Sequence, residues 1–449
     1  MSKLMIGISG VRGVVGDNLT PELLVNLGQA FGTWIESGTV VVGRDTRASG
    51  DMVKHAVFSG LLSAGCRIID VGVCGTPSAA MMINRLGADG GIVISASHNT
   101  IEWNALKFFR SDGVYLNQEQ GRQLLDIYYG GDAVKVGYER LHAVELDNSA
   151  VENHLEKVMT LVDVQALRKR KFRVAIDCCN GAGSLLALRF LEEVGCEVAS
   201  IYCDMNGVFY RNPEPTRTHV VNLLDTVKRH DADIGFAQDA DADRIAVISE
   251  TGNYIGEEYS LCLAAKYRLS QKKGPVVTNL STTRMLDDVA AEYGCEVLRT
   301  PVGEVNVAEA MLDTDAVIGG EGNGGVIDPR VHYGRDALTG MAILLQLLLE
   351  TGKTVNELVA EIPTYSMSKQ KVMISKRGVA AVLKHIAEEK ADRVDVRDGV
   401  KLDFADGWVH IRPSNTEPIV RVYAEARTSE RADELAYHYR TMVEDLTAK

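Results

Sequence analysis

One pattern occurs three times in this chain and restricts what it can fold into. Each copy has a β-branched strand, a polar turn, an amphipathic helix and a Gly-Cys pair that opens a second strand; the pairs are Gly65-Cys66, Gly195-Cys196 and Gly294-Cys295. A glycine at this place can adopt the left-handed conformation that closes a helix. Strands and helices that alternate in this way predict largely parallel or mixed sheets covered by helices on both faces. We therefore expect three similar α/β domains.

The last part of the chain has a different pattern. From about residue 367, short apolar strands such as 408–411 and 419–423 surround a helix near 379–389, and a further helix ends the chain. This order is typical of a separate α+β domain. At 449 residues the chain is long enough for several domains. We place the four domains at residues 1–150, 151–252, 253–366 and 367–449.

Composition excludes several classes of partner. The formal net charge of −13 repels phosphate backbones, so we expect no nucleic acid as a partner. We find neither an export signal nor an apolar stretch long enough for a bilayer, and we expect no membrane association.

Eight cysteines lie scattered without a CxxC pair, which favours a reducing cytoplasm. The oligomeric state stays open between a monomer and a homodimer.

An acidic turn stands between two apolar strands. Asp239, Asp241 and Asp243 occupy alternate positions, so their side chains point the same way if the backbone is extended. Three carboxylates this close repel one another, and a hard, oxygen-preferring cation such as Mg²⁺ removes that cost. Arg244, the next residue, suits a site that also handles phosphate.

Two other interpretations apply to this turn. The Asp-x-Asp-x-Asp spacing, with Glu250 in twelfth place, imitates a calcium-binding EF-hand loop, but Arg244 stands where that loop requires glycine, and β-rich runs flank it instead of helices. An exposed acidic turn without any ligand is the second alternative, and it stays open.

The stretch Ile94 to Thr100 is a second candidate site, because a polar turn directly follows an apolar strand. Ser97, beside His98 and Asn99, has the exposure that a nucleophile needs. It lacks the Gly-x-Ser-x-Gly elbow of esterases, and a plain serine turn is the alternative. A serine, a metal-binding carboxylate set and Lys107 a short way downstream together indicate phosphoryl transfer.

Two further loops have the composition of ligand-binding loops. The turn from Arg412 to Pro418 can encircle an anion, and Arg421 on the next strand could close the ring; a surface hairpin is the alternative. The anion-binding candidates here are Arg412, Ser414, Asn415, Thr416 and Arg421. The glycine-rich loop 319–325 allows the backbone to come close to a ligand, and Glu321 and Asn323 are its side chains that can hydrogen-bond hydroxyl groups. A flexible hinge has the same composition and is the alternative.

These motifs resemble the signature loops of one enzyme family. Ser95-Ala96-Ser97-His98-Asn99, Asp239 to Arg244, Gly320 to Gly324 and Arg412 to Pro418 look like the four loops of the α-D-phosphohexomutases, in that family's order and spacing. The stretches 7–13 and 43–47 also match, so the resemblance spans essentially the whole chain. It implies four domains around a central cleft, of which three share one α/β topology and the fourth is TBP-like.

The resemblance also implies a role for each loop. Ser97 would carry a phosphoryl group, and Asp239, Asp241 and Asp243 would hold Mg²⁺ together with an oxygen of that phosphoserine. Lys107 would act as a general acid or base, Arg12 would stabilise the developing charge, and His98 belongs to the same candidate catalytic set. The candidate substrate-binding residues are Arg244, Glu321, Asn323, Arg412, Ser414, Asn415, Thr416 and Arg421.

The implied reaction interconverts the 6- and 1-phosphates of a hexose through a hexose 1,6-bisphosphate. The sugar loop departs from many members of the family, because Gly322 replaces a Met or Gln and Gly325 replaces a histidine. This version of the loop is similar to that of phosphoglucosamine mutases, so glucosamine 6-phosphate is the expected substrate. Phosphomannomutase or phosphoglucomutase activity is the alternative, and a magnesium-dependent sugar phosphatase is a more distant one.

Overall fold

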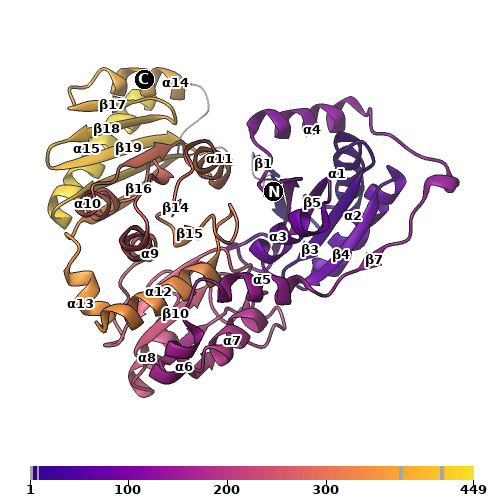
Figure 1. Cartoon of the computed structure of the whole chain (residues 1–449). Coiled ribbons are helices and arrows are strands. Elements are labelled where there is room, and N and C mark those ends of the chain that lie inside the picture. Colours follow the sequence, from indigo (N-terminus) through magenta and orange to yellow (C-terminus); the bar gives the residue numbers. More distant parts are fainter. Residues whose placement is uncertain (1–3, 8–9, 374–377, 415–418, 449) are drawn as a thin grey trace.

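The structure is a computed structural model that describes residues 4–7, 10–373, 378–414 and 419–448. These residues form four β-sheets, one in each of the ranges 5–146, 173–249, 276–327 and 366–426. In Figure 1 the four units follow one another in an arc, from the indigo first unit to the yellow last unit. The predicted fold class, three mixed-sheet α/β units and a C-terminal α+β unit, is confirmed. The boundaries that we placed between the domains remain a prediction.

The first unit has a seven-stranded sheet of order β1-β2-β6-β5-β3-β4-β7. Thr20 caps its first helix by accepting the Leu23 N–H, and Pro21 occupies the first helical position, where no N–H is needed. The elements of this unit are β1 (Met5–Gly7), β2 (Gly10–Val14), α1 (Pro21–Trp34), β3 (Thr39–Arg44), α2 (Gly50–Ser63), β4 (Arg67–Val73), α3 (Thr76–Leu86), β5 (Gly90–Ile94), β6 (Trp103–Arg110), α4 (Gln118–Gly130), the 3₁₀ turn η1 (Tyr138–Arg140) and β7 (Glu145–Leu146).

The second and third units have four-stranded sheets of order β11-β10-β8-β9 and β13-β12-β14-β15. The second unit contains α5 (Ala150–Met159), α6 (Val164–Arg170), β8 (Arg173–Asp177), α7 (Ser184–Glu193), β9 (Glu197–Ile201), α8 (Val221–Arg229), β10 (Ile234–Gln238) and β11 (Ile245–Ser249). The third contains α9 (Glu257–Gln271), β12 (Val276–Asn279), α10 (Met285–Glu292), β13 (Val297–Thr300), α11 (Glu304–Thr314), β14 (Ile318–Glu321), β15 (Gly325–Ile327), α12 (Ala337–Thr351) and α13 (Val355–Ala360).

The last unit is an antiparallel five-stranded sheet of order β16-β20-β19-β18-β17, with two helices. Its elements are β16 (Ser366–Met373), α14 (Val379–Ala387), β17 (Arg393–Asp395), β18 (Val400–Phe404), β19 (Gly407–Pro413), β20 (Ile419–Ala426) and α15 (Ser429–Ala448). This unit has a hydrophobic core of its own, formed within residues 372–446.

The three α/β sheets repeat one topology. A central strand pairs in parallel with the strand that follows its helix: β3 with β4, β8 with β9, and β12 with β13. The next strand pairs in parallel on the other side of the central strand, and a fourth strand returns antiparallel to it. The glycines Gly65, Gly195 and Gly294 have φ of 82°, 74° and 67°, as the sequence pattern predicts. The repeated pattern therefore reflects one fold used three times.

This repeat decides where the predicted loops lie. The connection from the third to the fourth strand of each repeat spans residues 95–102, 239–244 and 322–324. These are the serine loop, the acidic loop and the sugar loop that the sequence indicates. Because each connection leaves the carboxyl end of the equivalent parallel strand, the three loops are structurally equivalent.

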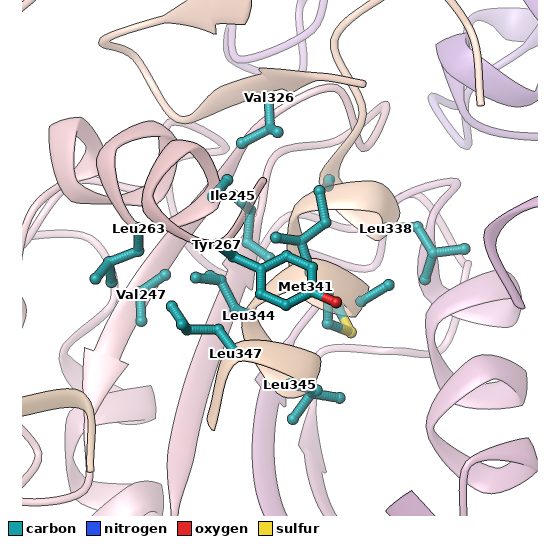
Figure 2. Packing of buried hydrophobic residues seen from close by; sticks show 14 of the residues in the cluster. Ile245, Val247, Leu263, Tyr267, Val326, Leu338, Met341, Leu344, Leu345 and Leu347 are labelled. Carbon is teal, nitrogen blue, oxygen red and sulfur yellow. The ribbon is translucent and has the colours of Figure 1, made fainter. Parts of the chain in front are cut away.

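Helix α12 joins the second and third units. Its residues from Ala337 to Leu348 are buried, as expected of a largely apolar stretch in which Gly340 and Gln346 are interruptions. Figure 2 shows Met341 and Leu344 among Ile245 and Val247 of β11 and Tyr267 of α9. The two units therefore share one hydrophobic core. None of the helices formed by the described residues is long and apolar enough to cross a membrane.

Candidate active site

All four units contribute to one cavity of about 860 Å³. Arg12, His98 and Asn99 line it from the first unit, and Arg244 from the second. The sugar loop contributes Glu321 to Asn323, and the last unit contributes Arg412 and Arg421. Residues from most of the predicted loops therefore meet around one space.

Ser97 directly precedes His98, which lines this cavity, and is itself only 2% exposed, so the exposure expected from its turn is not found. Its hydroxyl donates a hydrogen bond of 2.8 Å to Asp239 Oδ2, across 142 residues of sequence. Its φ of 50° lies in the left-handed region, which is strained for a serine. The structure thus brings the predicted nucleophile to the predicted acidic loop, in a conformation that its surroundings must enforce.

Arg47 holds the serine loop in this conformation. Its side chain is fully buried and pairs with Asp45 at 3.0 Å. Its guanidinium also donates to the backbone carbonyls of Ser97 at 2.8 Å and Asn99 at 2.7 Å, and to two more carbonyls further along the loop. The sequence drew attention to residues 43–47 only as part of a family resemblance, so this supporting role was missed.

The three carboxylates of the acidic loop come together through a turn, and not through the alternation of side chains along an extended strand. The backbone of residues 239–244 is a turn, with Ala242 at a φ of 58°, so the extended backbone in which alternate side chains would point the same way is not formed. One oxygen from each of Asp239, Asp241 and Asp243 nevertheless lies within 4.8 Å of the other two. The convergence therefore comes from a left-handed turn instead of from strand alternation.

The oxygen atoms of this loop suit a divalent cation. Asp241 Oδ1 and Asp243 Oδ1 are buried and have no hydrogen-bond partner among the described residues. Burial, with the charges of Asp243 and Asp241, raises the pKa of Asp239 well above its ordinary value. Buried carboxylate oxygens without donors are costly, and a hard cation such as Mg²⁺ takes such oxygens as ligands. The residues present therefore fit Mg²⁺.

Lys107 stands against the acidic loop. Its Nζ lies 2.5 Å from Asp241 Oδ2 and 3.6 Å from Asp243 Oδ2. Burial opposes its charge, but Asp241, Tyr115 and Asp243 outweigh burial and raise the pKa of Lys107 above its ordinary value. The amine is thus held as an ammonium group, which can donate a proton. The hydroxyl group of Thr76 donates a hydrogen bond to the same Asp241 oxygen. The sequence did not single out Thr76.

The remaining groups near Ser97 are basic side chains and an imidazole. Arg12 donates to the Asn99 side chain at 2.5 Å. His98 Nδ1 lies 3.3 Å from Ser97 Oγ, and burial, together with Arg244 and Arg12, lowers its pKa well below the ordinary value. His98 is therefore neutral, while two guanidinium groups supply positive charge beside the serine.

The sugar loop presents Glu321 and Asn323 to the cavity. Glu321 accepts hydrogen bonds from Asn279 at 2.8 Å and from Arg335 at 3.0 Å. Arg335 also pairs with Asp243 at 2.6 Å and Glu304 at 2.9 Å, so one buried guanidinium connects the sugar loop to the acidic loop. Sequence reasoning missed Arg335, although a charged Arg-Asp pair directly before the apolar helix α12 was a visible signal.

Arg335 also accounts for the glycine that replaces the histidine expected from the resemblance. A Cβ atom on Gly325 would lie 2.2 Å from Arg335 Cδ, so the arginine occupies the space that a larger residue would need. The missing side chain is thus replaced in space by one from a different part of the chain.

A row of basic residues crosses the last sheet. Arg421 on β20 stands directly opposite Arg412 on β19 and Lys371 on β16. All three line the cavity. Like charges at directly opposite positions destabilise a sheet, so this row is understandable if it meets an anion. Ser414 directly follows β19 and donates its backbone N–H to the Ile419 carbonyl, while Asn415 and Thr416 lie outside the described residues.

Comparison with known proteins agrees with this geometry. Residues 3–134, 152–252 and 257–365 match alpha/beta/alpha domains I, II and III of Phosphoglucomutase/phosphomannomutase, and residues 367–440 match its C-terminal domain. The chain belongs to this family, the α-D-phosphohexomutases. The family resemblance inferred from the sequence is therefore confirmed.

Individual members of the family are similar over nearly their whole length. A "Phosphoglucomutase/phosphomannomutase" from Thermococcus kodakarensis is 39% identical over 443 residues, which cover 97% of each chain. A "Probable phosphoglucosamine mutase" from Methanopyrus kandleri is also 39% identical, over 96% of this chain and 95% of the relative. The crystal structure of a Phosphoglucomutase/phosphomannomutase family protein from Burkholderia thailandensis superposes with a TM-score of 0.87 at 26% identity, covering 99% of this chain and 98% of the other.

Proposed function

We propose that this α-D-phosphohexomutase interconverts glucosamine 6-phosphate and glucosamine 1-phosphate through a phosphorylated Ser97 and a hexose 1,6-bisphosphate. The observation that carries the proposal is the 2.8 Å hydrogen bond between Ser97 and Asp239, next to His98 and Asn99 of the cavity that the basic row of the last sheet also lines. One end of the cavity can thus transfer a phosphoryl group while the other end holds the second phosphate. The names of several relatives support glucosamine as the sugar.

The first half-reaction exchanges one phosphorus–oxygen bond for another. The bond between phosphorus and Ser97 Oγ breaks, and a bond from phosphorus to the free sugar oxygen forms. The sugar hydroxyl releases one proton and Ser97 Oγ gains one. Lys107, held as an ammonium group, is the candidate donor to Ser97 Oγ, and the proton released by the sugar hydroxyl restores its charge. Arg12 and Arg244 supply positive charge where the transferred group accumulates negative charge.

Asp239, Asp241 and Asp243 would hold Mg²⁺, with an oxygen of the phosphorylated Ser97 as a further ligand. Bound there, Mg²⁺ neutralises charge on the transferred phosphoryl group. The chain's own part is to keep the three carboxylates together, which the turn at Ala242 and the pairs with Lys107 and Arg335 do.

The second half-reaction reverses the first from the other sugar oxygen. The bisphosphate turns end over end, and Ser97 recovers the phosphate that was previously held at the far end. Arg412 and Arg421, with Ser414, Asn415 and Thr416 of the same loop, are the proposed contacts for the phosphate that is not being transferred. Glu321 and Asn323 would hold the ring hydroxyls in both orientations, because one set of contacts can serve a nearly symmetrical substrate.

Mass spectrometry and a serine variant test this proposal. Intact protein should carry the added mass of one phosphoryl group on Ser97, and Ser97→Ala should lose both that mass and all interconversion of hexose phosphates while its circular dichroism is unchanged. Near-normal turnover in Ser97→Ala would remove the serine from the mechanism. Release of inorganic phosphate as the main product would identify the phosphatase alternative instead.

Phosphoglucomutase or phosphomannomutase activity is the second candidate, because a relative with 39% identity has that name. The ratio of kcat/KM values for the glucosamine, glucose and mannose phosphates separates the two.

A further inference from the structure

Glu258 reaches into the sugar loop from a different element. It is the second residue of α9, its side chain is 14% exposed, and it lines the cavity. Its Oε2 accepts the backbone N–H of Thr283 at 3.1 Å, which fixes the carboxylate against the loop. No motif in the sequence singled out this residue.

Gly322 is the counterpart of Glu258 in the sugar loop. A Cβ atom on residue 322 would lie 1.9 Å from Glu258 Oε2 and 2.5 Å from Oε1. The absence of a side chain at Gly322 therefore leaves room for the Glu258 carboxylate beside the sugar loop, and Glu258, Glu321 and Asn323 all line the same cavity. A carboxylate thus occupies the position in the loop where residue 322 would otherwise present its own side chain.

Among the residues that the structure describes, Glu258 forms a single ion pair, and that pair is long. Lys369 Nζ lies 4.0 Å from Glu258 and 3.2 Å from Glu257, which it hydrogen-bonds. One ammonium group therefore serves two carboxylates, and Glu258 has the longer contact. Burial raises the pKa of Glu258 to about 8, so the carboxyl group keeps its proton near neutral pH, and a second cation placed beside it would favour the ionised carboxylate.

We propose that Glu258 is a specificity residue that recognises the ammonium group of an aminosugar phosphate. The inference rests on the proposed function. An aminosugar and a hexose differ at one ring substituent, which is a charged ammonium in the first and a neutral hydroxyl in the second. A carboxylate placed among the ring-binding groups distinguishes these two, because a charge-assisted hydrogen bond is about twice as strong as a neutral one.

Two variants test the proposal from opposite sides of the contact. Glu258→Gln keeps the shape and the acceptor for Thr283 but removes the charge. Gly322→Ala leaves Glu258 intact and pushes its carboxylate away from the loop. Each should lower kcat/KM for glucosamine 6-phosphate by about 10- to 100-fold, the effect of losing one charged hydrogen bond, and should change kcat/KM for glucose 6-phosphate by less than about threefold.

Glu214→Gln is the matched control, because Glu214 lines the same cavity from the second unit and has its hydrogen bonds within residues 212–219. It should leave the ratio of the two kcat/KM values unchanged. The double variant Glu258→Ala/Gly322→Ala removes the steric conflict, so it should fold and show the same low ratio as Glu258→Gln.

The outcomes separate this inference from the function on which it rests. If the wild-type enzyme prefers glucosamine 6-phosphate and Glu258→Gln keeps that preference, the assignment of Glu258 is overturned and the mutase function stands. If the wild-type enzyme turns over no hexose phosphate, the proposed function itself is wrong, and the assignment of Glu258 falls with it.

Discussion

Replacing Arg47 by methionine tests whether a buried arginine imposes the conformation of the serine loop. The change keeps most of the volume of the side chain and removes five hydrogen bonds, of which one goes to Asp45 and four go to backbone carbonyls of residues 97–103. Both Arg47 and Asp45 have fully buried side chains. Asp45 would therefore remain as a buried charge without its partner.

The expected loss of stability follows from these contacts. Breaking a buried ion pair on one side costs about 3–5 kcal/mol. The buried carbonyl of Ser97, left without a donor, adds about 1–3 kcal/mol, while water can reach the part-buried carbonyls. The sum of about 4–8 kcal/mol is comparable to the whole stability of a typical domain, which is about 5–15 kcal/mol. Ser97 should also leave its strained φ of 50°.

Chemical denaturation and hydrogen–deuterium exchange measure the two effects. Arg47→Met should lower the free energy of unfolding of the first unit and increase exchange in peptides that cover residues 94–104, with turnover reduced at least 100-fold by misplacement of the serine. Arg44→Met is the control, because Arg44 pairs with Asp51, whose side chain is 67% exposed, and such pairs contribute about 1 kcal/mol or less. Equal stability and equal exchange in the two variants would refute the reasoning.

Two further predictions concern the far end of the cavity and a buried ion pair. Arg421→Ala should raise KM by about tenfold or more and lower kcat much less, because it removes a charged contact to the phosphate that is not transferred; steady-state kinetics measure this, and an unchanged KM would place that phosphate elsewhere. Asp336, 2.8 Å from His154, has a pKa below its ordinary value because the charge of His154 outweighs burial. Its contribution is therefore present above the unfolded pKa of about 3.9 and is lost as the pH falls below it. Asp336→Asn should lower the free energy of unfolding by about 3–5 kcal/mol at neutral pH and by less in acid. Chemical denaturation at several pH values measures this, and a difference in unfolding free energy between wild type and variant that does not change with pH would contradict it.

The sequence was sufficient for the repeated fold because the signals are local. Gly65, Gly195 and Gly294 end helices in the left-handed conformation, and this requirement depends only on the backbone at each position. The loops that contain Ser97 and Asp239 were recognisable for the same reason, since each combines a buried strand with a polar turn.

The groups that support the site could not be predicted from such signals. Three charged side chains act on loops that lie far from them in the sequence, namely Arg47, Arg335 and Glu258. Each of them meets the groups on which it acts only in the folded protein, so no local pattern indicates its role. The conformation of the acidic loop also could not be decided from the sequence, because alternation of aspartates is equally compatible with a strand and with the turn at Ala242. Long-range contacts decide between such local alternatives.

The separation of the hydrophobic cores bears on how a bisphosphate can rotate without being lost. The second and third units are joined by α12, whereas the last unit is packed around its own interior and touches the third through polar contacts such as Ser281 with His410 and Val302 with Asp398. Swinging the last unit outward would therefore break hydrogen bonds between the two units without opening either hydrophobic core. The chemical step can thus take place on the joined second and third units with the first, while movement of the last unit gives the bisphosphate room to turn.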